Sequence, residues 1–154
     1  MAALDWCLLA WKKYAVFSGR AGRREYWMFH LGAVVIAFVV FTLSGMIGSP
    51  IISTALRFLW RLAVLVPTMA VGVRRFHDMG RGAGPYFLIF IPSRIGQELH
   101  SWQPMMELAF AGRILGVTGT IILVVFCVQK GTRGNNRYGP EPGTDDAVKD
   151  GAGI

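Results

Sequence analysis

The sequence of 154 residues has little negative charge and little charge of any kind. Nine Asp and Glu stand against 16 Lys and Arg, and charged residues make up only 16% of the chain, whereas about a quarter is usual in soluble globular proteins. The sequence offers no evident pair of carboxylates for acid–base catalysis. The low charge and the lack of paired carboxylates therefore argue against a water-soluble enzyme.

Cysteine is scarce as well. Cys7 and Cys127 belong to no paired metal-ligand spacing, and both are expected on the reducing, cytoplasmic side, so we expect no disulfide. The sequence has no phosphate-cradling glycine loop and no telling Ser/His/Asp spacing. Asp5 interrupts the first apolar run, which disfavours a cleaved secretory signal. We expect no enzymatic activity, no catalytic residue, no metal and no cofactor.

Apolar residues, in contrast, are abundant. They form 53% of the chain, and the mean hydropathy is +0.44. The net charge of +7 and the pI near 10.0 would suit nucleic-acid binding in a soluble protein, but here the basic residues flank long apolar runs. The expected partners are membrane lipids, above all anionic ones, with a protein partner or a homo-oligomer as further possibilities and no nucleic acid.

Four segments are candidates for membrane spans, since about 20 apolar residues cross a bilayer. The span at 28–47 has no formal charge, and those at 53–73 and 108–128 carry few. The segment 84–103 contains Pro92 and is predicted to be a kinked span, a re-entrant segment or a half-helix. The predicted fold is an all-α, polytopic transmembrane helical bundle with four spans. In the last span, Gly112, Gly116 and Gly119 share a helical face that favours close helix packing.

The distribution of basic residues predicts the topology. Twelve of them lie before the first span, between the second and third, or after the last, and the positive-inside rule places all three regions in the cytoplasm. Both termini are then cytoplasmic, with Gly48 to Pro50 and His100 to Pro104 outside. The predicted location is a bacterial inner (plasma) membrane.

The regions outside the spans are predicted as follows. An amphipathic helix at 4–17 lies on the inner leaflet or packs on the cytoplasmic ends of the spans. Residues 74–83 form a loop, residues 134–142 form a turn-rich segment, and residues 143–154 form a flexible tail. Residues 1–142 make a single membrane domain.

Three motifs stand in a fixed relation to the spans: "FSGRAGRREYW", "VRRFHDMGRGAGPY" and "GNNRYGPEP". In this order they resemble the bacterial inner-membrane family known as domain of unknown function 805 (DUF805), over roughly Leu4 to Pro142. The resemblance implies a small helical membrane protein and supplies no activity. Compared with the family's usual loop, Phe76 replaces a leucine, and residues 83–86 alter the continuation.

The motif residues have two interpretations. In the first, they bind a lipid headgroup or a partner's acidic segment on a cytoplasmic basic face, where Arg23, Arg24, Arg74, Arg75 and Arg137 converge beneath the bundle. In the second, they anchor the protein and pair with one another. Asp78 would then accept hydrogen bonds from arginines, and His77 would pack or bond to backbone. The candidates are Arg20, Arg23, Arg24, Glu25, Tyr26, Trp27, Arg74, Arg75, His77, Asp78, Arg81, Arg137 and Tyr138.

Four arginines within the spans are not explained by topology. A candidate intramembrane polar cluster consists of Arg57, Arg61, Arg94, Glu98 and Arg113. In one hypothesis, Arg61 and Arg94, with Glu98, line a polar cavity that accepts an anion or a lipid phosphate. In the alternative, the arginines snorkel, so that their long side chains carry the charge to the membrane surface, as Arg57 and Arg113 could do. The sequence favours a non-enzymatic membrane module that binds anionic lipid or partner proteins. The alternative is a small transporter or channel for an anionic solute or lipid.

Overall fold

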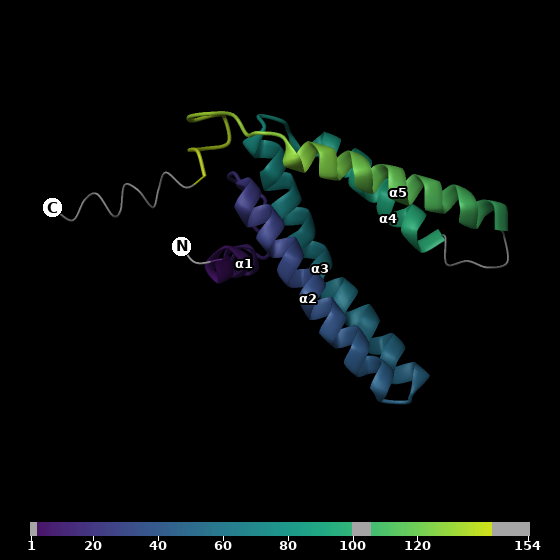
Figure 1. The fold of residues 1–154 in the computed structure, drawn as a ribbon. Coiled ribbons are helices and arrows are strands. Elements are labelled where there is room, and N and C mark those ends of the chain that lie inside the picture. Colours follow the sequence, from purple (N-terminus) through teal and green to yellow (C-terminus); the bar gives the residue numbers. More distant parts are fainter. Residues whose placement is uncertain (1–2, 100–105, 143–154) are drawn as a thin grey trace.

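The computed structural model describes residues 3–99 and 106–142, which form five helices (Figure 1). These are α1 (Ala3–Lys12), α2 (Arg23–Met46), α3 (Pro50–Asp78), α4 (Ala83–Leu99) and α5 (Met106–Val128). Helices α2 and α3 form one antiparallel hairpin, and α4 and α5 lie against each other as a second. The two hairpins meet near residues 129–142 and diverge away from them (Figure 1).

Among the described residues, three helices are long and apolar enough to cross a membrane: Arg23–Met46, Pro50–Asp78 and Ala109–Val128. Large apolar side chains cover their outer surfaces, for example Phe38 with 72% and Ile51 with 82% exposure. Because so much exposed apolar surface is unfavourable in water, the protein is a polytopic helical membrane protein. The all-helical prediction is confirmed.

Helix α4 is the predicted third span. It has 17 residues and continues through Pro92 without interruption, and it is not among the three described helices that are long and apolar enough to cross a membrane. The kinked span, the re-entrant segment and the half-helix therefore all stay predictions. At about 1.5 Å per residue it is about 25 Å long, near the lower limit for a span. Its crossing of the bilayer stays a prediction, and the predicted external residues 100–104 lie outside the described ranges.

The sequence explains the turn between α2 and α3 and the start of α3. Gly48 takes a positive φ of 72° there, which glycine adopts without strain. Ser49 caps α3, with its side chain accepting from the Ile52 N–H at 3.5 Å, and Pro50 begins the helix.

A second proline, Pro67, lies inside α3. Its missing N–H leaves the Ala63 carbonyl without its helical donor. The Tyr14 hydroxyl donates to this carbonyl at 2.8 Å. The hydrogen bond attaches the segment after α1 to the middle of α3.

The amino-terminal helix is shorter than predicted: it ends at Lys12 rather than at residue 17, and residues 13–22 run irregularly. It packs against α2. Ala10 is fully buried, and the Trp11 ring lies 5.7 Å from Phe29 and 6.3 Å from Trp60, centroid to centroid. The helix therefore packs on the spans, but its contact with Trp60 lies in the middle of α3 and not at a span end. Contact with the leaflet stays a prediction.

Helices α4 and α5 pack closely because small residues face each other. A Cβ atom added to Gly96 would lie 2.6 Å from the Gly112 carbonyl oxygen, and one on Gly119 would lie 2.5 Å from Ser93 Cβ. The predicted close packing of the glycine face of α5 is confirmed.

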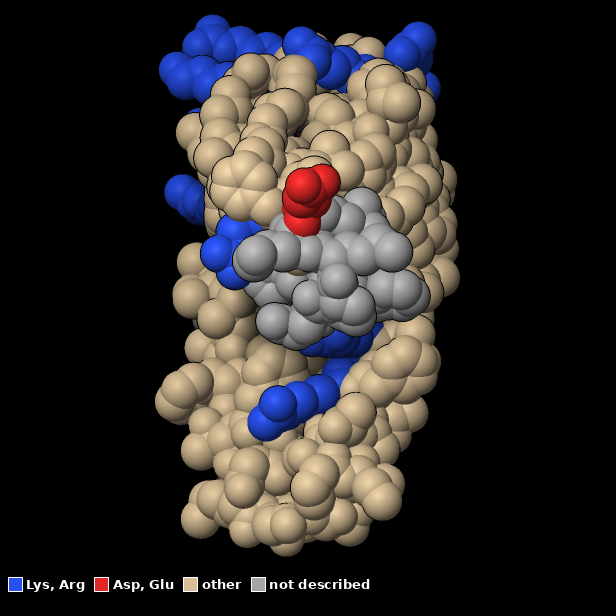
Figure 2. Space-filling model, turned by 90° about the vertical axis from the view of Figure 1, so that its right-hand side faces the viewer, with Lys and Arg blue, Asp and Glu red and all other residues tan. Residues whose placement is uncertain are grey.

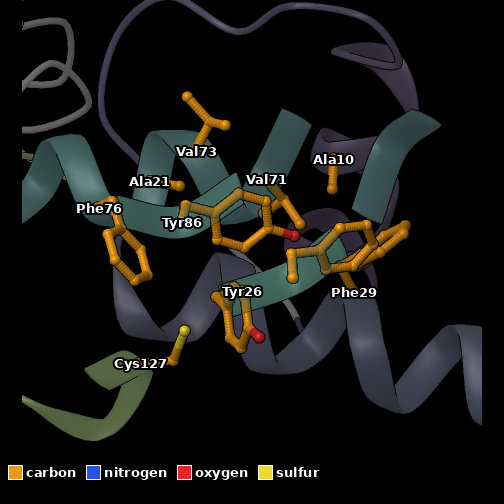
Figure 3. Close-up of a cluster of buried hydrophobic side chains, with 10 residues drawn as sticks. Ala10, Ala21, Tyr26, Phe29, Val71, Val73, Phe76, Tyr86 and Cys127 are labelled. Atoms are coloured by element: carbon orange, nitrogen blue, oxygen red, sulfur yellow. The ribbon is translucent and has the colours of Figure 1, made fainter. Parts of the chain in front are cut away.

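The core lies where the hairpins meet, and it draws on all five helices (Figure 3). Aromatic side chains dominate it: the rings of Phe76 and Tyr86 lie 5.4 Å apart at a steep angle, and Tyr86 and Phe90 stack at 5.2 Å. Gly72 leaves the space that the Tyr86 ring occupies. This core supports the end of α3 that carries the charged motif.

Candidate functional site

The segment predicted as a loop at 74–83 is largely helical. Residues 74–78 form the last turns of α3, and all five are buried. The helix ends because Gly80 takes a φ of 72°, with its N–H bonded to the His77 carbonyl and the Arg81 N–H bonded to the Phe76 carbonyl, both at 2.9 Å. These two bonds are those of a Schellman motif. The link to α4 is thus only residues 79–82.

Asp78 is the centre of a buried charge cluster. Its Oδ1 accepts from Arg20 Nε at 3.0 Å and from Arg20 Nη2 at 2.9 Å, and its Oδ2 accepts from Arg75 Nη1. The Asp78 side chain is only 6% exposed. The predicted pairing of this aspartate with nearby arginines is confirmed.

Arg20 also holds the chain after α5. Its Nη1 donates to the carbonyls of Gly134 at 2.6 Å and Gly139 at 3.3 Å, and its Nη2 donates to the Thr132 carbonyl at 2.5 Å. The Asp78 carbonyl accepts from the Thr132 N–H at 2.8 Å. The carboxyl-terminal segment is therefore bound to the end of α3 through both side chain and backbone.

Arg75 stabilises the end of α5. Its Nε donates to the Cys127 carbonyl at 3.2 Å, and its Nη2 donates to the Gln129 carbonyl. The last carbonyls of a helix lack partners within the helix and carry partial negative charge, so a guanidinium there is favourable. Arg75 thus links Asp78 at the end of α3 to the end of α5.

Arg74 joins α3 to α2. Its Nη1 lies 2.5 Å from Glu25 Oε1, and both side chains are almost fully buried. Glu25 is in the first turn of α2, where a negative charge is stabilised by the helix dipole. Within the described residues, Arg74 Nε and Nη2 have no hydrogen-bond partner. We call Arg20, Glu25, Arg74, Arg75 and Asp78 the arginine clasp.

His77 has structural contacts on two sides. Its Nδ1 lies 3.1 Å from the Gly19 carbonyl, which can only accept, so Nδ1 carries the proton. Its ring stacks on Tyr138 at a centroid distance of 3.9 Å and an angle of 2°. The structural interpretation of His77 is confirmed. In the described part of the chain, no three His, Cys, Asp or Glu side chains gather closely enough to hold a metal ion.

The predicted turn at 134–142 is present and folds back on the bundle. Asn136 and Gly139 exchange two backbone hydrogen bonds of 3.1 and 3.0 Å, and Gly139 has a φ of 126°. Arg137 Nη2 donates to the Gly80 carbonyl at 3.1 Å, and Asn136 Nδ2 donates to the His77 carbonyl at 3.0 Å. The turn therefore covers the end of α3. The predicted tail, residues 143–154, lies outside the described residues.

A polar groove of about 580 Å³ lies beside the clasp. Four exposed basic side chains line it, two from the start of α2 and two from the chain after α5. They are Arg23, Arg24, Lys130 and Arg133, and we call this the basic groove. Trp6, Asp78 and Glu141 also contribute to its wall. The prediction that five arginines converge in one pocket is therefore wrong. Arg23 and Arg24 line the groove, whereas Arg74 and Arg75 are buried in the clasp and Arg137 bonds to the 79–82 link.

The remaining motif candidates pack elsewhere. Tyr26 is buried in the core with 7% exposure, and Trp27 is exposed beside the space between the hairpins. Arg81 lies over the Phe126 ring, with its Cζ 4.5 Å from the ring centroid.

The predicted intramembrane cluster forms only in part. Arg61 and Arg94 line one cavity of about 440 Å³ between the hairpins. Arg57 does not line it: this side chain lies 3.5 Å from Ser44 Oγ and over the Phe41 ring. Arg113 is exposed on α5 and also lies outside that cavity. The Glu98 side chain lies outside the part of the structure that is described.

Residues 14–140 match the family described as "Protein of unknown function (DUF805)". The chain belongs to this family. It is 34% identical to the inner membrane protein YhaH and 31% identical to the inner membrane protein YhaI, both of Escherichia coli K12. Each alignment covers 90% of this chain, with 97% of YhaH and 96% of YhaI. The uncharacterized protein YiiR of the same strain is 29% identical over 81% of this chain and 84% of its own length. No solved structure matches.

The three motifs that carry the DUF805 resemblance meet in one place. Arg20 and Glu25 come from the first, Arg74, Arg75 and Asp78 from the second, and the carbonyls of Gly134 and Gly139 from the third. The motifs thus specify a buried junction of the inner-membrane fold.

Sequence reasoning did not select Lys130 and Arg133 as site residues. Their position directly after the last span was a usable signal, because this position places them at the same end of the bundle as Arg23 and Arg24.

Proposed function

We propose that this DUF805 protein is a non-enzymatic inner-membrane module that binds the headgroup of an anionic lipid in the basic groove. The observation that carries the proposal is the division of the arginines. Arg20, Arg74 and Arg75 are buried and engaged within the protein, whereas Arg23, Arg24, Lys130 and Arg133 are exposed around one groove. Contacts within the protein account for the three buried arginines. The four exposed basic side chains are available to a ligand.

The start of α2 adds to the attraction for an anion. Gly22 caps this helix without a side-chain hydrogen bond, and it lies on the groove. Free N–H groups at a helix start favour negative charge. A lipid phosphate near Arg23 would meet both the helix end and the guanidinium.

The proposed orientation supports a lipid as the ligand. The basic segments before α2, between α3 and α4 and after α5 lie at one end of the molecule (Figure 1), and the positive-inside rule assigns such an end to the cytoplasm. Anionic headgroups lie at this level, and each nearby Lys or Arg contributes about 1 kcal/mol of attraction. An acidic segment of a partner protein is the other ligand of matching charge.

The contacts of His77 and Asp78 support a role without catalysis. Both groups are committed to neighbours within the fold, so neither is placed to transfer a proton to a substrate.

The proposal is tested by lipid-dependent thermal stability of the protein purified in a neutral detergent. Phosphatidylglycerol should raise the unfolding midpoint more than phosphatidylcholine, because a ligand of the native state stabilises it. The double variant Arg23→Gln, Arg24→Gln should bind phosphatidylglycerol about 2 kcal/mol, or about thirtyfold, more weakly.

The matched control is Lys12→Gln, Lys13→Gln, which removes the same charge outside the groove. It should retain the response to phosphatidylglycerol. Equal losses in both double variants would contradict a defined groove, because they would indicate attraction by net charge alone.

A second candidate function is a small transporter for an anionic solute or lipid, and the cavity shared by Arg61 and Arg94 favours it. Solute-dependent flux in proteoliposomes that is lost in Arg94→Gln would support transport, and absence of any such flux would favour the module.

A further inference from the structure

The cavity between the hairpins, which we call the hairpin cavity, is independent of the basic groove. Residues of α2, α3, α4 and α5 line it, and none of them lines the groove. Figure 2 looks at the ends of the diverging hairpins; below the basic side chains along the top, it shows further Lys and Arg side chains and one acidic side chain among mostly uncharged residues. The presence of charge at this position requires an explanation that topology does not give.

One side of the hairpin cavity carries a band of connected polar side chains. Arg94 Nη1 donates to Gln97 Oε1 at 2.9 Å, and Gln97 Nε2 donates to Thr120 Oγ1 at 3.0 Å. Thr120 donates in turn to the Gly116 carbonyl at 2.8 Å. These bonds fix Arg94 on α4 against α5. Arg61 lines the same cavity from α3, so arginines from both hairpins border one space.

The remaining wall of the hairpin cavity is largely apolar and aromatic. It includes Phe41, Trp60, Leu65, Phe90, Leu123 and Val124, and His30, Thr68 and Ser93 are polar residues within it. A small hydrated anion would leave this wall without a partner. A molecule that carries both an anionic group and a hydrocarbon chain would match the polar band and the wall together.

The charges at this depth favour an anion. Residues 28–73 and 84–128, which include the predicted spans, contain two acidic and four basic residues. These are Glu98 and Glu107, and Arg57, Arg61, Arg94 and Arg113. Even with both glutamates ionised and paired, two positive charges remain. Arginine is costly within a bilayer unless it has a counterion or reaches water, and a bound phosphate group supplies that counterion in charge-assisted hydrogen bonds.

We propose that the hairpin cavity binds one anionic phospholipid, with its phosphate between Arg61 and Arg94 and an acyl chain along the apolar wall. The lipid enters sideways between the diverging ends of the hairpins. This site differs from the basic groove in residues, depth and access, so either proposal can fail without the other.

The test uses phosphatidylglycerol with a photoactivatable group on its acyl chain, in nanodiscs of the full protein and phosphatidylcholine. Crosslinked peptides are identified by mass spectrometry. The expected result is crosslinking to residues 37–65, 86–97 and 120–124, which carry the wall. The variant Arg94→Gln should weaken this binding about tenfold, because it removes a charge-assisted hydrogen bond.

Two control variants separate the cavity from general charge. Arg113→Gln removes an arginine that is exposed on α5 outside the cavity, and it should leave the crosslinks unchanged. Ala37→Trp fills the cavity without altering any charge, and it should abolish crosslinking to the wall. Unchanged thermal midpoints in phosphatidylcholine show that both variants remain folded.

The outcomes that would overturn the proposal are distinct. Crosslinks confined to the ends of the helices, or equal crosslinking in Ala37→Trp, would exclude a lipid in the cavity. Full competition by inorganic phosphate would indicate a site for a free anion. Disulfide-linked dimers formed through a single cysteine in Phe41→Cys or Trp60→Cys, in place of lipid crosslinks to the wall, would identify a second chain as the occupant. Loss of cavity crosslinking in Arg23→Gln, Arg24→Gln would show that the two sites are not independent.

Discussion

At the scale of single residues, the clasp shows how a membrane protein uses charge as structure. A buried ion pair gains stability only when its remaining hydrogen-bonding groups are satisfied, because desolvation of both charges is costly. Arg20 and Arg75 meet this condition by bonding to backbone carbonyls as well as to Asp78. The cluster therefore joins three chain segments, which are the stretch before α2, the end of α3 and the chain after α5.

Replacing Asp78 with Asn should destabilise the protein by about 3–5 kcal/mol, because two buried guanidinium groups would lose their shared anion. Insertion into the membrane should be unaffected, since no basic residue is removed. The thermal unfolding midpoint in neutral detergent measures the effect. Glu107→Gln, at an exposed acid at the start of α5, is the matched control and should leave the midpoint near that of wild type. An Asp78→Asn protein as stable as wild type would disprove the structural role of the clasp.

At the scale of helices, α4 and α5 depend on contact between backbones rather than between large side chains. At Gly96, Gly116 and Gly119, an added methyl group would lie 2.6, 2.9 and 2.5 Å from the nearest atom of the opposite helix, which is closer than van der Waals contact allows. Dispersion and the absence of intervening side chains hold such a pair together in lipid, where the hydrophobic effect is weak. Every side chain added at this surface separates the helices.

Gly119→Ala should therefore destabilise the α4–α5 pair by about 1–3 kcal/mol, the usual cost of overpacking. Its Cβ would lie 2.5 Å from Ser93 Cβ. Gly45→Ala in α2 is the control, because nothing lies within 4 Å of a Cβ atom there, and alanine favours a helix over glycine. Thermal unfolding should show a lower midpoint for Gly119→Ala and an unchanged or higher one for Gly45→Ala. The reverse order would show that the two helices do not pack as described.

At the scale of the whole molecule, hydrophobic runs predicted the helices because apolar length is a strong local signal. They did not predict that 74–78 would be helical, since a cluster of charges resembles a surface loop until its partners in distant segments are known. The pairing of Asp78 with arginine followed from charge alone, whereas the choice of Arg20 and Arg75 required the fold. The position of Lys130 and Arg133 after the last span indicates the same end of the bundle as Arg23 and Arg24, but that these four side chains line one groove required the fold.

The membrane orientation is also a property of the whole chain, and it decides whether α4 is a span. We expect Arg81 and Lys130 inside and Met46 and Glu107 outside, because this arrangement places the basic segments in the cytoplasm. Single cysteines at these four positions, in a chain lacking Cys7 and Cys127, are exposed to an impermeant maleimide on intact cells. All four side chains are exposed in the structure, so each should react after lysis, which is the control for access. Labelling of Met46→Cys and Glu107→Cys alone before lysis would establish four crossings. Labelling of Lys130→Cys before lysis, with Glu107→Cys protected, would mean that α4 returns to the cytoplasmic side and that the carboxyl terminus is external.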